Sequence, residues 1–463
     1  MAGIGFELNR LFQKKGVFSN IRACIYSMLV TIGPTILCIF FIIGMSMFMR
    51  SQGVAVKIVE LIQATIMYSF MGALILTSGY CILLSRYLED QIYNKKYENI
   101  LPSLYGAIVL VLGAVLIISY IFYKPADLPV FYKGLASLLF LQVSVQLVLG
   151  CYTSVLKNYK KISFAFIVGM SVGSVIYILA IWIQGKWHEY WCLISINSAF
   201  LVINWILIHQ NQSYFIGRSH AYFKFLSYLK MSKWAVLSNV FWVVGLYSHN
   251  IIMWQEPGLQ VQISNAYVFA PQYDTPAFFA FLTVLPSLVI FVVKLETSFL
   301  VKYNSYFKFI NQGACYQDIQ WVKKDMKKAL SQEILYLMQM QLIFTIGGIL
   351  IGMLCFRMIG FTLKTIYLFS ILCLGYYCSI IMFIIMTILL YFEDGKGASM
   401  TTGLFFVVTS ISTIVTLSMG SQYYGIGLFI GGMSSLVVGL VRIKYFIKNI
   451  NYYIFCKYSN WSE

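Results

Sequence analysis

The side chains of this 463-residue chain that could do chemistry are ionisable groups set inside long apolar runs. Lys294 and Glu296 stand near the end of the run 275–300, and His249 stands in another run beside Asn250. A charge at the centre of a bilayer costs roughly 2.5–3.5 kcal/mol on insertion scales, so such a residue indicates a partner or a cavity. Lys294 and Glu296 are two positions apart and point to different sides of a helix. They could line the inner mouth of a path or extend to the lipid headgroups, and both interpretations stay open.

His249 has two interpretations. It could face a polar cavity or sense protonation, because histidine titrates near neutral pH. A histidine that hydrogen-bonds across a helix interface is the favoured interpretation. Asp274, directly before the run 275–300, is interpreted as a helix cap.

Amide side chains in the apolar runs are more numerous than charges. The candidates for a substrate path among them are Gln142, Gln146, Asn204, Asn239 and Asn250. They could simply hydrogen-bond helices together. A neutral path lined with amides and aromatic rings would instead suit an uncharged, hydroxyl-rich substrate such as a sugar. A cation antiporter would be expected to carry acids deep in its membrane spans. The first six runs show none there, since Glu60 and Glu189 stand at the starts of their runs, which counts against proton- or sodium-coupled efflux.

Motifs of catalysis and of cofactor binding are lacking in the sequence. There is no phosphate-binding P-loop, so the chain cannot power transport with ATP by itself. None of the four histidines pairs with Asp or Glu at ligand spacing, and the ten cysteines form no CxxC pair. The sequence therefore predicts no enzyme activity, no catalytic residue, no metal site and no cofactor.

The elements that must hold these side chains are membrane-spanning helices. Hydrophobic residues make up 60% of the chain, charged residues 11%, and the mean hydropathy is +0.79. A span needs about 20 mostly apolar residues, and the continuous apolar runs exclude the alternating strands of a membrane barrel. The predicted spans are 24–49, 58–85, 102–123, 132–155, 162–183, 189–209, 234–255, 275–300, 334–356, 365–391, 398–419 and 422–447.

The distribution of Lys and Arg predicts the orientation of these spans. With the N-terminus in the cytoplasm, 25 of the 33 Lys and Arg fall in cytoplasmic segments, seven in outer loops, and Lys294 within a span. Cytoplasmic loops of membrane proteins carry this excess. We therefore expect a multi-pass membrane protein with both termini in the cytoplasm. The net charge of +17 is a topology signal rather than a sign of nucleic-acid binding, because the basic residues are dispersed.

The layout of the spans repeats once. An amphipathic basic segment precedes span 1 and another, around Phe225, precedes span 7, so we expect a parallel repeat of two six-helix lobes. Two-lobed transporters place the substrate path between lobes, whereas channels more often assemble several copies of a small unit. GxxxG pairs such as Gly427 and Gly431 indicate close helix packing. The predicted domains are an N-terminal cytoplasmic helix 1–20, an N-lobe 21–215, a C-lobe 216–450 and a cytoplasmic tail 451–463.

The segment 302–333 between spans 8 and 9 is amphipathic and basic. One apolar stripe includes Tyr306, and a second includes Val322 and Met326. Lying on anionic lipid is the first interpretation of such a segment. Docking of a cytoplasmic partner enzyme is the alternative, and its candidate residues are Trp321, Lys323, Lys324, Lys327 and Lys328.

Three blocks of the sequence resemble one family over what looks like the whole chain. They are MAGIGFELNRLF at the start, SRYLEDQIYNKKYENILPSL after span 2 and YDTPAFFAFLTVLPSLVIFVVKLETSFLVKYNSYF around span 8. They are similar to PelG, the family of inner-membrane proteins of Pel exopolysaccharide secretion. That family is a polysaccharide transporter branch of the multidrug/oligosaccharidyl-lipid/polysaccharide (MOP) superfamily, whose members have two six-helix lobes around a central cavity.

The resemblance implies a substrate and partners. It implies export of a nascent N-acetylhexosamine polymer made by a cytosolic, PelF-like glycosyltransferase. It also implies a complex with PelD-like and PelE-like membrane subunits. In its light the segment 302–333 becomes a candidate docking surface, and the region of Lys294 and Glu296 the place where the polymer enters. A lipid-linked oligosaccharide flippase, a cation-coupled small-molecule exporter and a scaffold for the synthase are the alternatives.

Overall fold

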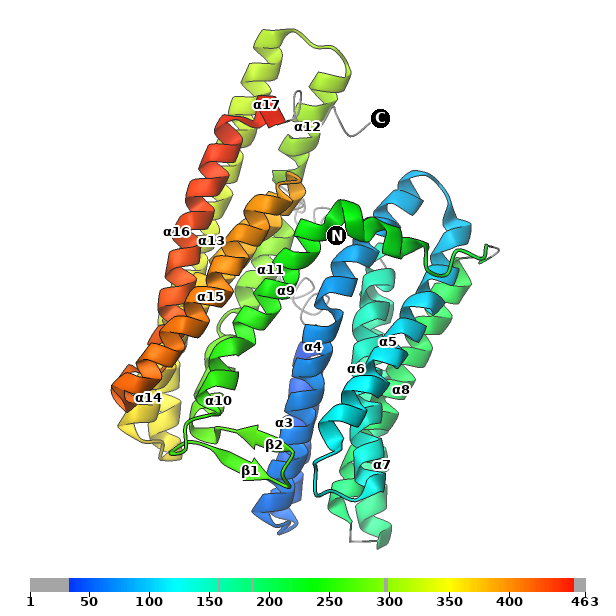
Figure 1. Cartoon of the computed structure of the whole chain (residues 1–463), viewed down its shortest axis with the longest axis vertical. Helices are drawn as coiled ribbons and strands as arrows, with labels where there is room; N and C mark the ends of the chain where they lie inside the picture. Colours follow the sequence, from blue (N-terminus) through cyan, green and yellow to red (C-terminus); the bar gives the residue numbers. More distant parts are fainter. Residues whose placement is uncertain are drawn as a thin grey trace, which may run out of the picture. The chain divides into compact units, whose positions relative to one another are not determined.

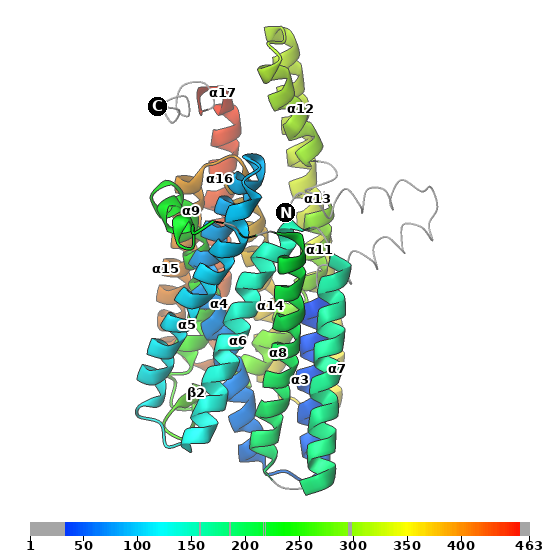
Figure 2. The same cartoon turned by 90° about the vertical axis from the view of Figure 1, so that its right-hand side faces the viewer.

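The computed structural model describes residues 33–156, 159–184, 187–215, 217, 219–294 and 299–453. Twelve helices within this part of the chain are long and apolar enough to cross a membrane, which confirms the predicted all-helical, multi-pass architecture. The predicted helix 1–20 lies outside the described residues, as does most of the predicted tail 451–463. Figures 1 and 2 show the long helices that make up most of the described chain.

The helices fall into two compact units. The first, here called the N-unit, takes the described residues up to Val236 and also Pro257–Ala270. The second, the C-unit, takes Leu237–Glu256 and the described residues from Pro271 onward. The elements of the N-unit are α3 Gly33–Ser51, α4 Val56–Tyr93, η1 Tyr97–Asn99, α5 Ile100–Tyr123, α6 Val130–Val155, α7 Tyr159–Gln184, α8 His188–Tyr214, η2 Lys224–Ser227, β1 Val261–Ile263 and β2 Tyr267–Phe269.

Helix α9, Tyr228–Met253, begins in the N-unit and continues into the C-unit. The other elements of the C-unit are α10 Pro271–Leu282, α11 Leu285–Lys294, α12 Leu300–Asn311, α13 Tyr316–Ile359, α14 Leu363–Tyr391, α15 Gly395–Met419, η4 Ser421–Tyr423, α16 Ile426–Lys448 and α17 Ile450–Tyr452.

The boundary between the units lies further along the chain than the division at 215/216. The segment before α9 packs on the N-unit: the buried ring of Phe225 contacts Tyr87, and the carbonyl of Tyr222 lies against Gly106. Tyr87 also contacts Tyr228 at the start of α9. Buried aromatic contacts therefore hold the start of span 7 to the N-unit.

Small residues set the helix spacing in both units, as the GxxxG pairs predict. A Cβ atom on Gly173 of α7 would lie 2.9 Å from the carbonyl oxygen of Ser195 in α8. A Cβ atom on Gly427 or Gly431 of α16 would overlap the backbone of α15 at Thr413 or Thr409. Helix α14 is buried along most of its length and packs on α10, α13, α15 and α16. The C-unit is thus built around α14.

Span 8, predicted at 275–300, corresponds to the candidate span Pro271–Val292, and its helix is interrupted within that span. Helix α10 ends at Leu282 and α11 begins at Leu285, next to Pro286. A proline ring has no N–H to donate to the carbonyl four residues earlier, so Pro286 cannot continue the helix from Leu282. At the break, the backbone N–H groups of Thr283 and Val284 donate to the carbonyls three residues earlier, as in a 3₁₀ turn.

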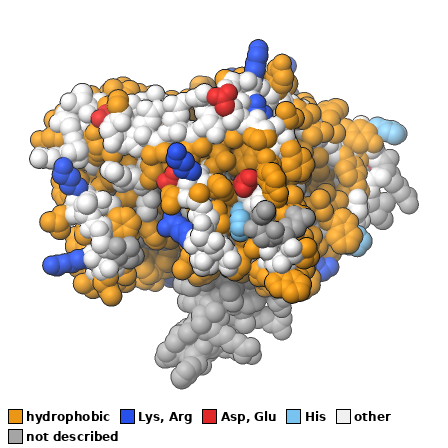
Figure 3. Space-filling model, turned by 90° about the horizontal axis from the view of Figure 1, so that it is seen from below, with side chains coloured by type: hydrophobic (Ala, Val, Ile, Leu, Met, Phe, Trp, Pro, Cys, Tyr) orange, Lys and Arg blue, Asp and Glu red, His pale blue; other side chains and the backbone are white. Residues whose placement is uncertain are grey.

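Strands β1 and β2 form an antiparallel hairpin that the sequence analysis does not predict. Val261 pairs with Phe269 and Ile263 with Tyr267. The hairpin lies at the lower end of α4 in Figure 1. Seen from that end, the surface is mostly hydrophobic with scattered charged side chains (Figure 3).

Candidate functional site

His249 is fully buried in the C-unit between two tyrosines. Its Nδ1 lies 2.8 Å from the hydroxyl of Tyr273 on α10, and its Nε2 lies 3.4 Å from the hydroxyl of Tyr376 on α14. Both rings also meet the imidazole edge-on. The histidine therefore joins α9, α10 and α14, and its side chain is not open to a cavity in this structure.

Asp274 lies in the first turn of α10, not at its cap position. Its carboxylate accepts hydrogen bonds from Asn250 Nδ2 at 2.7 Å and from Trp254 Nε1 at 3.0–3.1 Å. A helix N-terminus stabilises a carboxylate through its free N–H groups and its dipole. Asn250 thus tethers α9 to α10. Asp274 is therefore the acceptor of this contact between helices and not the helix cap that the sequence predicts.

The amides of the N-unit meet at the α6–α8 interface. Gln142 Nε2 donates to Asn197 Oδ1 at 3.3 Å, and Asn204 Nδ2 donates to the backbone carbonyl of Gln142 at 3.0 Å. The side-chain oxygens of Gln142 and Asn204 are buried without a hydrogen-bond partner. Gln146 is half-buried one turn along α6 from Gln142, and Asn239 is half-buried on α9. Gln142 and Asn204 are therefore inter-helix contacts that retain two free acceptors.

The break in span 8 is a polar point inside the C-unit. Gln341 of α13 is fully buried and directs its Nε2 at the carbonyl of Thr283, 3.5 Å away, and at Thr345 Oγ1, 3.0 Å away. The Gln341 Oε1 atom and the buried Ser287 hydroxyl have no hydrogen-bond partner. Discontinuous membrane helices commonly form substrate sites because the break frees backbone groups. Sequence analysis misses this site, although Pro286 inside an apolar run is the signal that marks it.

Lys294 lies at the end of α11 and faces α13. Its Nζ is 3.9 Å from Glu333 Oε2 and 4.7 Å from the ring centroid of Tyr336. Its proposed companion Glu296 lies outside the described residues. The charge of Lys294 thus has an acidic and an aromatic neighbour, so the long side chain is held against α13.

Asp394 and Arg442 form an ion pair that the sequence analysis misses. Arg442 Nε and Nη2 donate to the two carboxylate oxygens at 2.6 and 2.9 Å. Asp394 also caps α15 by accepting from the N–H of Gly397 at 3.2 Å. The carboxylate is 4% exposed and the arginine 27% exposed. Asp394 directly before a helical run is the N-cap signal that could have identified it.

Helices α12 and α13 form a hairpin that carries the predicted docking residues. Tyr306 of α12 and Val322, Met326 and Leu330 of α13 are buried, and α12 packs on α13, so neither apolar stripe is exposed as a whole. Trp321 is 69% exposed. Lys324, Lys327 and Lys328 are exposed, and Lys323 is half-buried. Figures 1 and 2 show this hairpin extending past the other helices of the C-unit.

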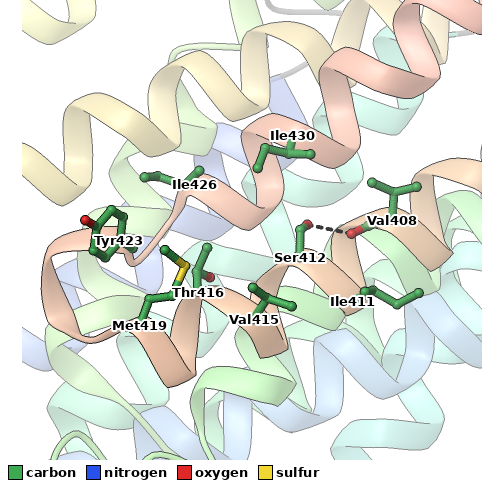
Figure 4. Close-up of a pocket in the computed structure, with 9 residues that line it drawn as sticks. All are labelled: Val408, Ile411, Ser412, Val415, Thr416, Met419, Tyr423, Ile426 and Ile430. Atoms are coloured by element: carbon green, nitrogen blue, oxygen red, sulfur yellow. Dashed lines mark hydrogen bonds between the residues drawn. The ribbon is translucent and has the colours of Figure 1, made fainter.

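A shallow groove of about 410 Å³ lies between α15 and α16 (Figure 4). Its walls are mainly aliphatic, and the Ser412 hydroxyl is turned to backbone carbonyls, among them that of Gly427 at 2.9 Å. Such a surface fits a lipid chain better than a sugar, which needs exposed hydrogen-bonding groups. Within the described residues, no cluster of three or more His, Cys, Asp or Glu could hold a metal ion.

A family model matches residues 1–455, nearly the whole chain; its description is "PelG: Putative exopolysaccharide Exporter (EPS-E)". The match confirms the resemblance seen in the three sequence blocks. No curated protein matches the chain.

Solved transporters of the MOP superfamily share the fold. An outward-facing multidrug resistance transporter of the MATE family is 14% identical, with a TM-score of 0.61, over 96% of this chain and 98% of its own. A MOP superfamily transporter from Pyrococcus furiosus is 13% identical, with a TM-score of 0.60, over 96% of both chains. An inward-facing MATE transporter is 13% identical, with a TM-score of 0.54, over 88% of this chain and 94% of its own. These likenesses show the fold, which is the two-lobed fold of MOP superfamily transporters.

Proposed function

This chain belongs to the PelG family, and we propose that it exports a nascent Pel-type exopolysaccharide, an N-acetylhexosamine polymer, across the bacterial cytoplasmic membrane. The observation that carries the proposal is the family match over residues 1–455. The interior polar groups support it, because amides and tyrosine hydroxyls suit a neutral, hydroxyl-rich substrate better than they suit a cation. Gln142, Asn204 and Gln341 each keep a free acceptor oxygen that a sugar hydroxyl could use in another conformation of the transporter.

We propose further that a cytosolic glycosyltransferase (PelF-like) docks on the α12–α13 hairpin, on the predicted cytoplasmic side. Helix α13 has 44 residues, roughly 66 Å at 1.5 Å per residue, about twice the roughly 30 Å of a hydrocarbon core. The apolar part predicted to span the membrane is 334–356. The lysines at 323–328 therefore lie roughly 9–16 Å along the helix before that part begins.

The packing of the hairpin, not its height above the membrane, favours a protein partner over lipid. A helix that lies on lipid needs a free apolar face, and the stripe of Val322 and Met326 is already buried. PelD-like and PelE-like membrane subunits complete the proposed complex.

The deciding experiment reconstitutes the chain with the glycosyltransferase in sealed vesicles and supplies nucleotide sugar on the outside. We expect polymer to accumulate in the lumen, protected from an added glycosidase, without an ion gradient and without lipid-linked precursors. Lumenal transfer of lipid-linked sugars alone would show a flippase instead. Transport that requires a proton or sodium gradient would show a coupled exporter, and copurification without lumenal polymer would show a scaffold.

A further inference from the structure

The β1–β2 hairpin belongs by chain order to the C-unit, but it packs on the N-unit. It follows α9 and precedes α10, both of which end or begin in the C-unit. Its residues nevertheless group with α4 and α5, as the division at Pro257–Ala270 records. The chain therefore passes from the C-unit to the N-unit and back within about fifteen residues.

One tyrosine of α4 makes two hydrogen bonds to the backbone of one hairpin residue. The Tyr68 hydroxyl donates to the carbonyl of Val268 at 2.6 Å and accepts from the N–H of the same residue at 3.1 Å. This satisfies the outward-facing backbone groups of the edge strand β2, which would otherwise lack partners. Tyr68 thus acts as the next strand would in a larger sheet.

A cluster of aromatic rings buries the same strand. Tyr267 is fully buried, its hydroxyl lies 2.8 Å from that of Tyr123, and its ring meets those of Tyr68 and Phe122 at centroid distances of 5.2 and 5.8 Å. Aromatic pairs of this kind stabilise a contact beyond the area they bury. The hairpin is therefore held by packing as well as by hydrogen bonds.

The tip of the hairpin is bound separately to the loop after α5. The backbone N–H of Asp127 donates to the carbonyl of Ser264 at 3.0 Å, and Asn265 Nδ2 donates to the Asp127 carboxylate. Ser264 and Asn265 both have positive φ angles, which place the turn where these bonds form. Side chains and backbone of α4, α5 and the loop thus fix the hairpin at three points.

We infer that the hairpin is a permanent part of the N-unit and serves as the pivot on which the C-unit moves during transport. The inference follows from the lengths of its two links. Only Ala270 separates Phe269 of β2 from Pro271 of α10, so these Cα atoms stay within about 7.6 Å in any arrangement of the units. The other link, from Glu256 to Val261, has five Cα–Cα steps and reaches roughly 17 Å.

The two links have different roles because of this difference in reach. Glu256 still belongs to the turn that closes α9, since its N–H donates to the carbonyl of Met253. The start of α10 is therefore tied closely to the hairpin, whereas the end of α9 is joined to the hairpin by a longer link. Transporters that rock one lobe against another need such a point, where a few residues absorb the change in angle.

The first test locks the hairpin with a disulfide between Asp127→Cys and Asn265→Cys, verified by mass spectrometry of the linked peptides. Both side chains are exposed and already in contact. We expect polymer export into vesicles to remain at the wild-type level with the disulfide formed. Loss of export on oxidation that a reductant restores would show that the hairpin must detach, and would overturn the inference.

The second test lengthens each link. Four Gly-Ser residues inserted between Ala270 and Pro271 should lower export to about a tenth, as hinge changes do. The same insertion after Gly258, in the long link, should leave export near wild type. Equal effects of the two insertions at equal membrane abundance would contradict the assignment of the pivot.

The readout by export rests on the proposed function, so a third measurement does not use it. Spin labels at Gln262 of β1 and Val130 of α6, both exposed, report the distance between the hairpin and its N-unit anchor. We expect one narrow distance distribution in nanodiscs with and without the glycosyltransferase. A second, longer population would overturn the inference, even if wild-type protein exported no polymer.

Discussion

At the scale of single residues, Asp394 and Arg442 form the most buried ion pair in the described part of the C-unit. The carboxylate is nearly excluded from solvent and has two charge-assisted bonds to the guanidinium and one from the N–H of Gly397. Removal of one partner from a buried pair leaves an uncompensated charge in a low-dielectric environment. The ion pair therefore ties the start of α15 to the end of α16.

We predict that Arg442→Met lowers the stability of the protein by about 3–5 kcal/mol, because it leaves the Asp394 carboxylate buried and unpaired. The matched control is Lys302→Met, which breaks the more solvent-accessible ion pair with Asp325 and should cost less than about 1 kcal/mol. Thermal unfolding in detergent, followed by size-exclusion chromatography, compares the two. Equal losses for both variants would show that the Asp394 pair is not buried in the protein in detergent.

Residue types in the spans can be identified from the sequence, but their partners cannot. His249, Asn250, Gln142 and Asn204 are conspicuous because polar groups are rare in apolar runs. Their bonds run to residues 24 to 127 positions away, such as Tyr273 and Tyr376 for His249. No local pattern encodes such pairing. Whether these residues take part in transport remains a prediction of the sequence analysis.

At the scale of elements, the break in span 8 depends on one helix that approaches it closely. A Cβ atom on Gly348 of α13 would lie 2.6 Å from the Thr283 side chain, at the break. One turn before Gly348 along α13, Thr345 holds Gln341, whose amide reaches the Thr283 carbonyl. The small residue and the amide thus act together on the same point of span 8.

We predict that Gly348→Val destabilises the C-unit by about 1–3 kcal/mol, because the added methyl groups overpack the break at Thr283. Gly347→Val is the control on the same helix: nothing lies within 4 Å of a Cβ atom there, so its effect should be small. Both variants introduce the same β-branched residue at neighbouring positions of one helix, so the cost in helix propensity is the same for both. Thermal unfolding measures both; a Gly347→Val loss as large as that of Gly348→Val would refute the packing argument.

Hydropathy predicts the spans because lipid requires every long apolar run to be a helix. It does not predict the features that depend on short segments. Pro286 interrupts an otherwise apolar run, which a 20-residue window averages away. The hairpin at 261–269 has only three-residue strands. Its stabilising contacts come from Tyr68 and Tyr123, which lie 200 and 144 residues away from their partners in the sequence.

At the scale of the whole molecule, a cluster of basic residues lies on the α12–α13 hairpin, the proposed docking surface. Lys323, Lys324, Lys327 and Lys328 lie within six residues on one helix, beside the exposed indole of Trp321. A cluster of positive charge is electrostatically complementary to an acidic protein surface. Export driven by polymer elongation would need the synthase at this membrane face.

We predict that changing these four lysines of α13 to glutamate weakens binding of the glycosyltransferase at least about tenfold, since like charges then face each other across the contact. The matched control changes four exposed lysines elsewhere in the chain, Lys95, Lys96, Lys230 and Lys233, to glutamate, so the net charge falls equally.

Binding is measured on nanodiscs of neutral lipid and again on nanodiscs with anionic lipid, each at two salt concentrations. A partner-protein contact predicts loss with the α13 variant alone, the same in both lipids, with wild-type affinity falling as salt rises. Loss confined to anionic nanodiscs would assign the lysines to lipid instead. Equal loss in both variants would reduce their role to net charge.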